Sequence, residues 1–331
     1  MEYRLLGRSG LKVSALSLGT MTFGRNTPDK PLGSVGPEEA RRHIDLCLDH
    51  GVNLIDTANV YTRGQSEEII GEALAGRRDT VVLATKARFN MHGRPNTGGN
   101  SRINLIAECE RSLKRLRTDW IDLYQVHQWD GETPVDETVE ALDALVRSGK
   151  VRYVGCSNFL AYRLARAIGV SETRRLVRFD CVQPRYNLLF REFERELLPL
   201  CSEEGIGVIP YNPIAGGMLS GKHDRSKPPA EGTRFTLGNA ARTYTDRYWH
   251  DNVFDTVDEL AKIADHAGMA LPTLAVAWVL QHPAITSPIV GASRPEQLDA
   301  TIAAVDTKLD ADLVERLNEV TAAYRRGDAP R

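Results

Sequence analysis

The feature that most constrains the fold is a regular alternation of short β-rich runs with longer amphipathic stretches along the 331 residues. Such alternation is typical of βα units, in which helices cover a parallel sheet. Eight candidate strands can be read: Ala15–Leu18, Asn53–Asp56, Val81–Thr85, Ile121–Gln125, Arg152–Ser157, Asp180–Gln183, Gly207–Tyr211 and Thr286–Val290. This number of strands predicts an α/β protein, a (β/α)8 TIM barrel that spans residues 1–331 as one domain.

The stretches between these strands have apolar residues three and four positions apart, as the buried face of a helix requires. Candidate helices are Glu38–His50, Arg102–Arg115, Val135–Ser148 and Arg191–Glu204. Proline is favoured at the start of a helix and glycine just beyond its end. The sequence has both signals, with Pro134 and Pro272 at expected starts and Gly51, Gly149 and Gly205 after expected ends.

Two segments lie outside the repeat. Residues 3–13 predict a small β-hairpin that could close the bottom of the barrel. Residues 212–250 predict a long loop after the seventh strand, rich in glycine and proline and ending in a basic and aromatic tail. Loops of this length in a compact barrel are usually functional.

An open doubly wound sheet is the structural alternative. Its dinucleotide fingerprint, GxGxxG, is absent after the first candidate strand, and the partial match at Gly205 and Gly207 fails at Pro210. If a dinucleotide binds, we therefore expect it to bind without a Rossmann fold.

The composition and charge indicate which ligands and which cellular compartment to expect. A net charge of −2 offers no general field for nucleic acid or an anionic membrane, so an anionic ligand needs a local cluster of basic residues. The five cysteines are dispersed and without a CxxC pair, which favours a reducing compartment. The charged start MEYRLLGRSG does not resemble a signal peptide, and the apolar stretch Leu271–Leu280 is too short to span a bilayer. We expect a cytoplasmic protein.

In a (β/α)8 barrel the carboxyl ends of the strands face one mouth, where active sites are built. The residues at these ends are mostly polar or ionisable: Gly19, Thr20 and Met21; Asp56, with Tyr61 close behind; Lys86; His127; Ser157 and Asn158; Gln183; Tyr211 and Asn212; and Gly291. The glycines after the first and last strands suit close approach of the backbone to a ligand.

Four of these residues, Asp56, Tyr61, Lys86 and His127, together predict a catalytic group. Singly, Asp56, Lys86 and His127 would be interpreted as a helix cap, a solvated charge and a core histidine. With Tyr61 they follow three successive strands, the convergence that a catalytic constellation requires. An ammonium lowers the pKa of a nearby tyrosine, and a carboxylate keeps a buried lysine charged. With His127 on the substrate carbonyl, the four predict a general acid and an electrophilic pocket suited to hydride transfer.

Longer motifs then resemble a known family. They are YRLLGRSGLKVSALSLGTMTFG at the start, GVNLIDTANVY (51–61), ATK (84–86), VHQWD (126–130), VGCSNF (154–159), YNPIAGGMLSGK (211–222) and GASRPEQL (291–298). In order and spacing they are similar to the aldo-keto reductase superfamily, in the branch with bacterial general reductases, aryl-alcohol dehydrogenases and potassium-channel β-subunits.

The resemblance implies a carbonyl reductase that binds NADPH across the barrel mouth without a metal. Asp56, Tyr61, Lys86 and His127 would form the catalytic tetrad, with Gly19, Thr20, Met21 and Asp56 also facing the cofactor. Ser157, Asn158 and Gln183 would hold the carboxamide, and Tyr211 would stack on the nicotinamide. Asn212, Pro213, Ile214, Gly216, Lys222 and Arg234 would follow the phosphates, and Gly291, Ser293, Arg294 and Gln297 would close on the adenosine. The chain departs from the family at Ala300 and Thr301, where an acidic residue and an asparagine commonly hold the adenine.

Two other functions stay open at this point. A regulatory subunit that binds NADPH with little turnover is disfavoured by His127, because the resemblance implies asparagine at this position in the channel β-subunits, whereas this chain has the full tetrad. A metal-dependent hydrolase would need several ligands at the mouth, where only Asp56 and His127 qualify. Pocket candidates are Met21, Phe23, Tyr61, Phe89, Trp129 and residues 242–249, which favour an apolar or aromatic carbonyl substrate. A homo-oligomer is compatible with the sequence.

Overall fold

A computed structural model describes residues 1–25 and 33–325. Within them, eight parallel strands form one curled sheet in the order β10-β3-β4-β5-β6-β7-β8-β9. The strands are β3 (Ser17–Gly19), β4 (Leu54–Asp56), β5 (Val82–Ala87), β6 (Ile121–Val126), β7 (Val151–Ser157), β8 (Cys181–Gln183), β9 (Gly207–Val208) and β10 (Ile289–Val290). The predicted (β/α)8 class is confirmed, since each candidate strand contains or overlaps one of these eight.

The two edges of the sheet meet through β9 and β10. The amides of Thr286 and Ile289 donate to the carbonyls of Val208 and Pro210, each at 2.8 Å, and Tyr211 forms a parallel bridge with Ile289. These bonds leave the ring of strands without an open edge. The first strand begins at Ser17 rather than at the predicted Ala15, because the Ala15 amide donates to Glu2 in the N-terminal segment instead of to a neighbouring strand.

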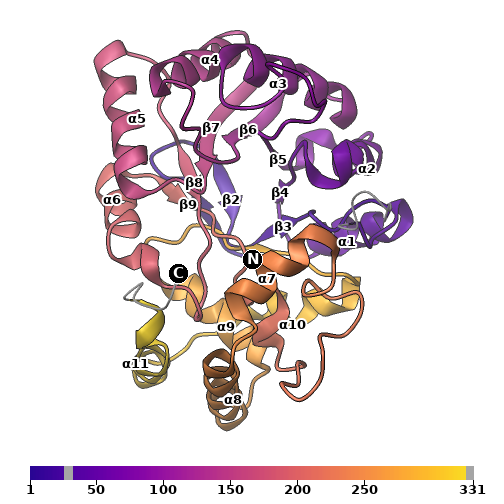
Figure 1. Cartoon of the computed structure of the whole chain (residues 1–331), viewed down its shortest axis with the longest axis vertical. Coiled ribbons are helices and arrows are strands. Elements are labelled where there is room, and N and C mark those ends of the chain that lie inside the picture. Colours follow the sequence, from indigo (N-terminus) through magenta and orange to yellow (C-terminus); the bar gives the residue numbers. More distant parts are fainter. Residues whose placement is uncertain (26–32, 326–331) are drawn as a thin grey trace.

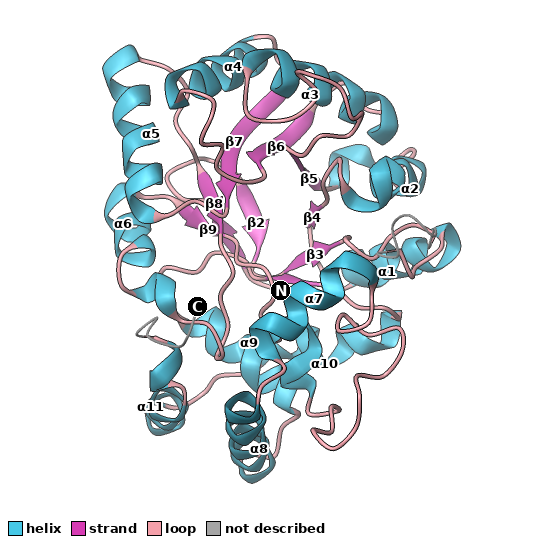
Figure 2. Ribbon diagram, viewed as in Figure 1, coloured by secondary structure: helices cyan, strands magenta, loops and turns pink. Residues whose placement is uncertain are grey.

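Helices surround the ring of strands (Figures 1 and 2). They are α1 (Pro37–Asp49), α2 (Gln65–Ala73), α3 (Arg102–Leu116), α4 (Val135–Arg147), α5 (Ala161–Arg174), α6 (Leu197–Glu204), α7 (Gly238–Tyr248), α8 (Asp251–His266), α9 (Leu271–Gln281), α10 (Asp299–Ile302) and α11 (Ala311–Val320). Gly51, Gly149 and Gly205 follow helix ends with positive φ, as predicted. Taken singly, no described helix is long and apolar enough to cross a membrane; α8 and α9 pass that test only together, across a 91° bend.

The predicted helix Arg191–Glu204 is wrong at its start. A 3-10 turn occupies Glu192–Glu194, and α6 begins only at Leu197. Pro199 explains the difference, because its ring excludes the helical hydrogen bond and the space that the carbonyl of residue 195 would need. Within the first turn of α6 the same proline is harmless.

The predicted hairpin at residues 3–13 is confirmed, one residue longer, as β1 (Tyr3–Leu5) paired antiparallel with β2 (Lys12–Ser14). Leu6 and Val13 are fully buried in a cluster that fills the barrel interior with Leu54, Val82, Ala84, Leu123, Cys181, Ile209 and Ile289. Burial of a leucine of this kind stabilises a fold by about 1.5–3 kcal/mol. The hairpin therefore closes one end of the barrel and leaves the carboxyl ends of the strands free for a site.

The prediction of a continuous loop over residues 212–250 is wrong in its second half. Gly238–Tyr248 form α7 in that half, and the first half contains only a short 3-10 turn, Ala215–Ser220. The glycines and prolines of the segment stop at residue 238, after which Tyr244 and Tyr248 recur at helical spacing and are both buried. In Figure 1, α7 lies in front of one side of the ring.

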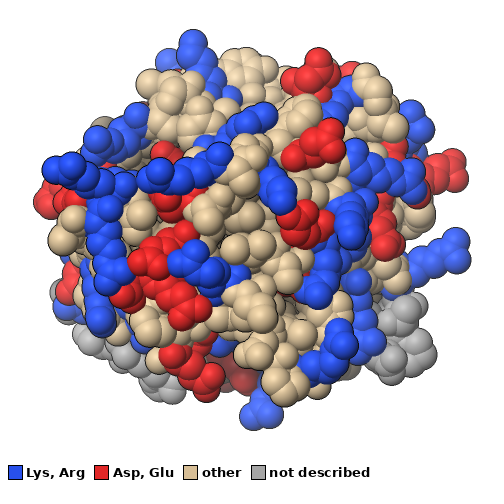
Figure 3. Space-filling view, turned by 90° about the horizontal axis from the view of Figure 1, so that it is seen from above, with Lys and Arg blue, Asp and Glu red and all other residues tan. Residues whose placement is uncertain are grey.

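The outer surface carries charges of both signs. Figure 3 shows Lys and Arg interspersed with Asp and Glu over one face. Among the exposed pairs, Glu140 of α4 binds Arg102 of α3 at 2.7 Å and Arg174 of α5 at 2.6 Å. Such exposed pairs contribute only about 0.2–1 kcal/mol each, so this surface does not dominate the stability of the fold.

Candidate active site

A cavity of about 370 Å³ opens at the carboxyl ends of the strands. It brings together most residues that the sequence predicted for a site: Gly19, Thr20, Met21, Asp56, Tyr61, His127, Ser157, Asn158, Gln183, Tyr211, Asn212, Pro213, Ile214, Gly216, Lys222, Arg234, Gly291, Ser293 and Gln297. Two predicted residues do not line it. Lys86 is fully buried behind the cavity wall, and Arg294 is exposed beside its rim.

Lys86, at the end of β5, links two of the cavity residues. Its Nζ donates to Asp56 Oδ2 at 2.5 Å, to the Thr57 carbonyl at 2.8 Å and to the Tyr61 hydroxyl at 3.4 Å. The other carboxylate oxygen of Asp56 accepts from Gln125 and Gln183, at 3.0 and 2.9 Å. The buried Asp56 charge is therefore held by three donors, and the buried ammonium by a carboxylate.

The electrostatics assign protonation states. Burial lowers the pKa of Lys86, but the charges of and hydrogen bonds to Asp56 and Tyr61 together outweigh it; the net shift is upward, so the lysine stays charged. Burial raises the pKa of Tyr61 more than the Lys86 ammonium lowers it. The sequence predicted only the lowering of the Tyr61 pKa by the ammonium. At neutral pH the site thus holds a protonated phenol beside a fixed positive charge, which is the proton-loaded form of a general acid.

His127 follows β6 and faces Tyr61 across the cavity. Its ring makes edge contacts with Tyr61 and Phe89, at centroid distances of 5.9 and 4.9 Å. Burial lowers its pKa well below 6.5, and the charges of Lys86 and Arg88 lower it further, so the imidazole is neutral. A neutral imidazole keeps one N–H donor. A carbonyl oxygen between His127 and Tyr61 could accept from both.

The backbone that carries Tyr61 is strained. Thr62 and Arg63 adopt left-handed conformations, with φ of 46° and 55°, in the 3-10 turn Tyr61–Gly64. For a β-branched residue this costs about 1–3 kcal/mol and persists only where the surroundings enforce it. The Thr62 hydroxyl donates to the Phe23 carbonyl at 2.7 Å and anchors the turn. Phe23 itself is fully buried against His43, so its predicted place in the substrate pocket is wrong.

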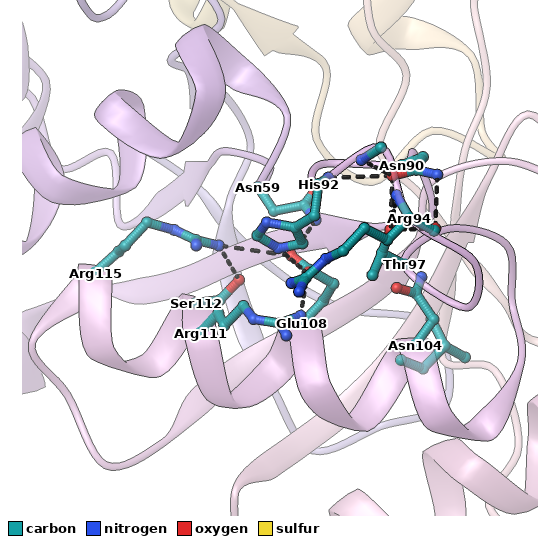
Figure 4. A network of polar contacts seen from close by, with 12 residues as sticks. Asn59, Asn90, His92, Arg94, Thr97, Asn104, Glu108, Arg111, Ser112 and Arg115 are labelled. Atoms are coloured by element: carbon teal, nitrogen blue, oxygen red, sulfur yellow. Dashed lines mark hydrogen bonds and ion pairs between the residues drawn. The ribbon is translucent and has the colours of Figure 1, made fainter.

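A polar network behind the same loop was missed by the sequence analysis (Figure 4). Glu108, fully buried on α3, accepts from Asn59 at 2.7 Å and from Arg111 at 2.6 Å, and His92 lies 3.2 Å away. The Asn59 amide donates to the Lys86 carbonyl at 3.0 Å. The network therefore ties α3 to the loop between Asp56 and Tyr61. Its available signal was a glutamate on the apolar face of the predicted helix Arg102–Arg115.

The far wall of the cavity presents amides and aromatic rings. Asn158, with φ of 57°, donates to the His127 carbonyl at 3.1 Å and accepts from the Tyr211 hydroxyl at 2.9 Å. Asn212 accepts from the Tyr244 hydroxyl at 3.2 Å, while its amide nitrogen is buried without a partner among the described residues. Donors left free in this way can serve a bound ligand.

Three cavity positions require glycine because a larger residue would clash with a neighbour, and the neighbour differs from one position to the next. A Cβ on Gly216 would lie 2.4 Å from the Tyr244 ring, so this glycine lets α7 approach the loop. A Cβ on Gly291 would lie 2.8 Å from the Gly19 carbonyl, and one on Gly19 would lie 2.7 Å from Ile289. Close contact between neighbouring strands therefore explains Gly19 and Gly291, for which the sequence predicted close approach to a ligand.

Positive charges gather at the other end of the cavity. Partial burial and the charge of Arg294 both lower the pKa of Lys222. Arg234 lies with its guanidinium 5.9 Å from the Tyr244 ring, and one of its terminal nitrogens is buried without a partner among the described residues. A cluster of positive charges with free N–H donors can bind an anion.

A family comparison decides the class of the protein. The model of the aldo/keto reductase family matches residues 15–322, which is nearly the whole chain. The chain belongs to the aldo/keto reductase family.

Relatives of this aldo/keto reductase carry several names. It is 41% identical over 332 residues to an uncharacterized oxidoreductase, YrpG, of Bacillus subtilis, covering 97% of this chain and 96% of that one. A probable voltage-gated potassium channel subunit beta of Arabidopsis thaliana is 38% identical, with 92% of each chain covered. Versiconal hemiacetal acetate reductase of Aspergillus parasiticus is 34% identical, with 96% of each covered. Family and relatives together support an oxidoreductase that reduces carbonyl groups.

Only some of the residues that the sequence predicted for the substrate pocket line the cavity of this aldo/keto reductase. Met21 and Tyr61 line it, as do Tyr244 and Arg247 from residues 242–249. Trp129 does not line it and packs on Phe159, with ring centroids 5.2 Å apart. The described residues bring no three His, Cys, Asp or Glu side chains together as a metal site.

Ala300 and Thr301, which differ from the residues common in the family, do not take part in the cavity. Neither residue lines the cavity, and Thr301 is buried with its hydroxyl bonded to the Leu298 carbonyl at 2.9 Å. The Ala300 carbonyl accepts from Thr273 at 2.7 Å. Of the residues predicted near them, Gln297 does line the cavity, where its Oε1 accepts from the Ser293 amide and hydroxyl.

Proposed function

We propose that this chain reduces an aldehyde or ketone to the alcohol with NADPH, using Tyr61 as the proton donor. The observation that carries the proposal is the buried chain from Asp56 through Lys86 to Tyr61, which ends at the cavity opposite the neutral His127. Carbonyl reduction needs a proton for the nascent alkoxide and a dry pocket that stabilises its charge. In this proposal the Tyr61 hydroxyl supplies the proton, and the His127 ring supplies a second hydrogen-bond donor to the charged oxygen.

Each residue of the tetrad takes one task in this proposal. His127 and Tyr61 hold the substrate carbonyl oxygen by hydrogen bonds and thereby polarise its carbon. The phenol then gives its proton to that oxygen as negative charge develops there. The Lys86 ammonium, 3.4 Å from the hydroxyl, stabilises the phenolate that remains. Asp56 keeps the lysine charged and in position.

The cavity suits a nicotinamide dinucleotide. When bound, NADPH would supply the hydride. Ser157, Asn158 and Gln183 would hold its carboxamide, and Tyr211 would cover its ring; one adjustment is implied, because the Gln183 amide nitrogen already donates to Asp56. The unpartnered nitrogens of Asn212 and Arg234 would meet its phosphates.

A preference for NADPH over NADH is supported by the charges at the far end of the cavity. The extra phosphate of NADPH requires cations at one place, and the net charge of −2 provides no general field. Lys222 and Arg294 lie close enough for the charge of one to lower the pKa of the other, and Arg234 lines the same cavity. A phosphate among them would relieve their repulsion.

The test is NADPH oxidation, followed by its absorbance, over a panel of aldehydes, ketones and keto-sugars. We expect turnover of one or more of them, together with tighter binding of NADPH than of NADH in fluorescence titrations. The kinship with channel β-subunits favours a second candidate, a regulatory subunit that binds NADPH with little turnover. Tight NADPH binding without reduction of any compound would favour that second function.

A further inference from the structure

One cation in the cavity has no part in the proposed chemistry. Along α7, the residues Ala240, Thr243, Tyr244 and Arg247 line the cavity. Their spacing of three and four places them on one face of the helix. Arg247 is half-buried at the end of this face and forms no salt bridge with any described residue.

A second guanidinium lies near it. Arg185 stands two residues beyond β8 and forms a backbone bridge with Tyr211. Its guanidinium lies 3.5 Å from the centroid of the Phe190 ring and 5.9 Å from that of Tyr248. Burial lowers the pKa of Arg185, and the charge of Arg247 lowers it further. Arg185 does not itself line the cavity, and within the described residues no carboxylate forms a salt bridge with either arginine.

Arg247 lies toward the catalytic end of the cavity. Its helix α7 is tied to that end, because the Tyr244 hydroxyl donates to Asn212 at 3.2 Å and Asn212 directly follows Tyr211. Burial raises the pKa of the Tyr211 hydroxyl to about 12, and the charges of Arg247 and Arg185 oppose the rise. That hydroxyl donates to Asn158 at 2.9 Å, and Asn158 donates to the His127 carbonyl at 3.1 Å. The charge of Arg294, by contrast, lowers the pKa of Lys222, and neither Arg247 nor Arg185 is among the causes of that shift.

Hence we propose that Arg247 binds an anionic group of the substrate and selects carbonyl compounds that carry a carboxylate or phosphate. The inference rests on the proposed reductase function and names its substrate class. The rings of Tyr61 and Tyr244, which line the cavity with Arg247, suit an apolar or aromatic body between the carbonyl and the anion. An arginine grips such a group with two parallel hydrogen bonds, which neutral analogues cannot accept equally.

The experiment compares 4-carboxybenzaldehyde with its neutral methyl ester, methyl 4-formylbenzoate. We expect the wild type to prefer the acid, and Arg247→Met to lower kcat/KM for the acid by about 10–100-fold, mainly through KM, as the loss of charged hydrogen bonds implies. The ester and the dissociation constant of NADPH should stay within about twofold of wild type by the same reasoning. Arg247→Lys, which keeps the charge, should restore part of the preference.

Arg242→Met is the matched control. Arg242 lies on the same helix, is 90% exposed, pairs with Asp246 and does not line the cavity. It should leave both substrates unaffected. Equal losses on acid and ester in Arg247→Met, or a wild type without preference, would overturn the proposal. A selective loss of NADPH affinity would also overturn it and assign Arg247 to a cofactor phosphate.

A binding measurement separates this inference from the proposed function. The alcohol 4-(hydroxymethyl)benzoate is titrated calorimetrically into the protein saturated with NADP⁺, which needs no turnover. Binding that Arg247→Met weakens supports the anion site even if no aldehyde is reduced, in which case only the reductase function fails. Absence of wild-type binding, or equal binding by the variant, would overturn the anion site itself.

Discussion

The Lys86 ammonium and the Asp56 carboxylate lie 2.5 Å apart, and both are almost fully buried. Breaking such a pair on one side leaves an uncompensated charge in the interior, which typically costs about 3–5 kcal/mol. The pair is held in place by Gln125 and Gln183 on the carboxylate and by the Thr57 carbonyl on the ammonium. The same ion pair therefore positions the lysine beside the proposed proton donor and stabilises the barrel.

Replacement of Tyr61 by phenylalanine should abolish reduction while cofactor binding survives. The variant removes the hydroxyl that gives the proton, and general acid catalysis contributes about 10²–10⁴-fold. Steady-state rates with a small aldehyde and fluorescence titration of NADPH measure the two effects. Tyr162→Phe, on the exposed surface of α5, is the control. A Tyr61→Phe variant with near-normal turnover would remove this residue from the mechanism.

Lys86→Met should lower both activity and stability. The phenolate loses its stabilising charge, and the buried Asp56 carboxylate loses its counterion, so we expect at least a hundredfold loss in kcat and about 3 kcal/mol in free energy of unfolding. Asp56→Asn should reduce kcat less, because Asp56 acts through Lys86. Urea unfolding and steady-state rates test both variants. Equal stability of Lys86→Met and wild type would contradict the buried ion pair.

The stability of the fold should fall below pH 6.5, in part through His127. Its pKa in the folded state lies well below 6.5, so the unfolded chain binds a proton first as pH drops. Folding stability therefore decreases as pH falls through the unfolded value, by up to about 1.4 kcal/mol per pH unit for this group. Unfolding free energies at pH 7.5 and 5.5 should differ less in His127→Asn than in wild type. Identical differences would show that His127 takes up a proton as readily in the folded state as in the unfolded chain, against its assignment as a neutral imidazole.

Arg294→Ala should weaken the binding of NADPH and leave that of NADH almost unchanged. The extra phosphate would lose one charged hydrogen-bond partner, worth about 1.5 kcal/mol at this exposed position, or roughly tenfold in the dissociation constant. Arg42→Ala, which removes an exposed arginine paired with Glu296, is the control. Equal losses for the two cofactors would indicate that Arg294 supports the local fold and that the phosphate binds elsewhere.

Glu108→Gln should destabilise the protein more than a surface substitution of the same type. The buried carboxylate accepts hydrogen bonds from Asn59 and Arg111, and its loss should cost about 1–3 kcal/mol. Glu110→Gln, two residues along α3 and partly exposed against Lys150, should cost less than about 0.5 kcal/mol. Chemical unfolding of both variants makes the comparison. A smaller effect at Glu108 would show that the network does not anchor the Tyr61 loop.

The sequence by itself determined the eight-strand repeat, the hairpin and the positions of Asp56, Tyr61, Lys86 and His127 near strand ends. These features are local, because hydrophobic periodicity and the punctuation of glycine and proline act within a few residues. The closed barrel then brings together the ends of strands that lie far apart in the chain. Given eight strands, the meeting of these side chains follows from topology.

Only the tertiary structure decided how deeply each side chain of the site is buried and which distant residues it bonds to. Gln125 bonds to Asp56 across 69 residues and Glu108 to Asn59 across 49, and neither pairing has a local pattern. The pKa of Tyr61 rises because burial outweighs the lysine beside it, a balance that depends on every neighbouring atom. The same holds for Phe23, which turns into the core although it follows the cavity residue Met21 by only two positions. Burial is a property of the packed whole, so no window of sequence contains it.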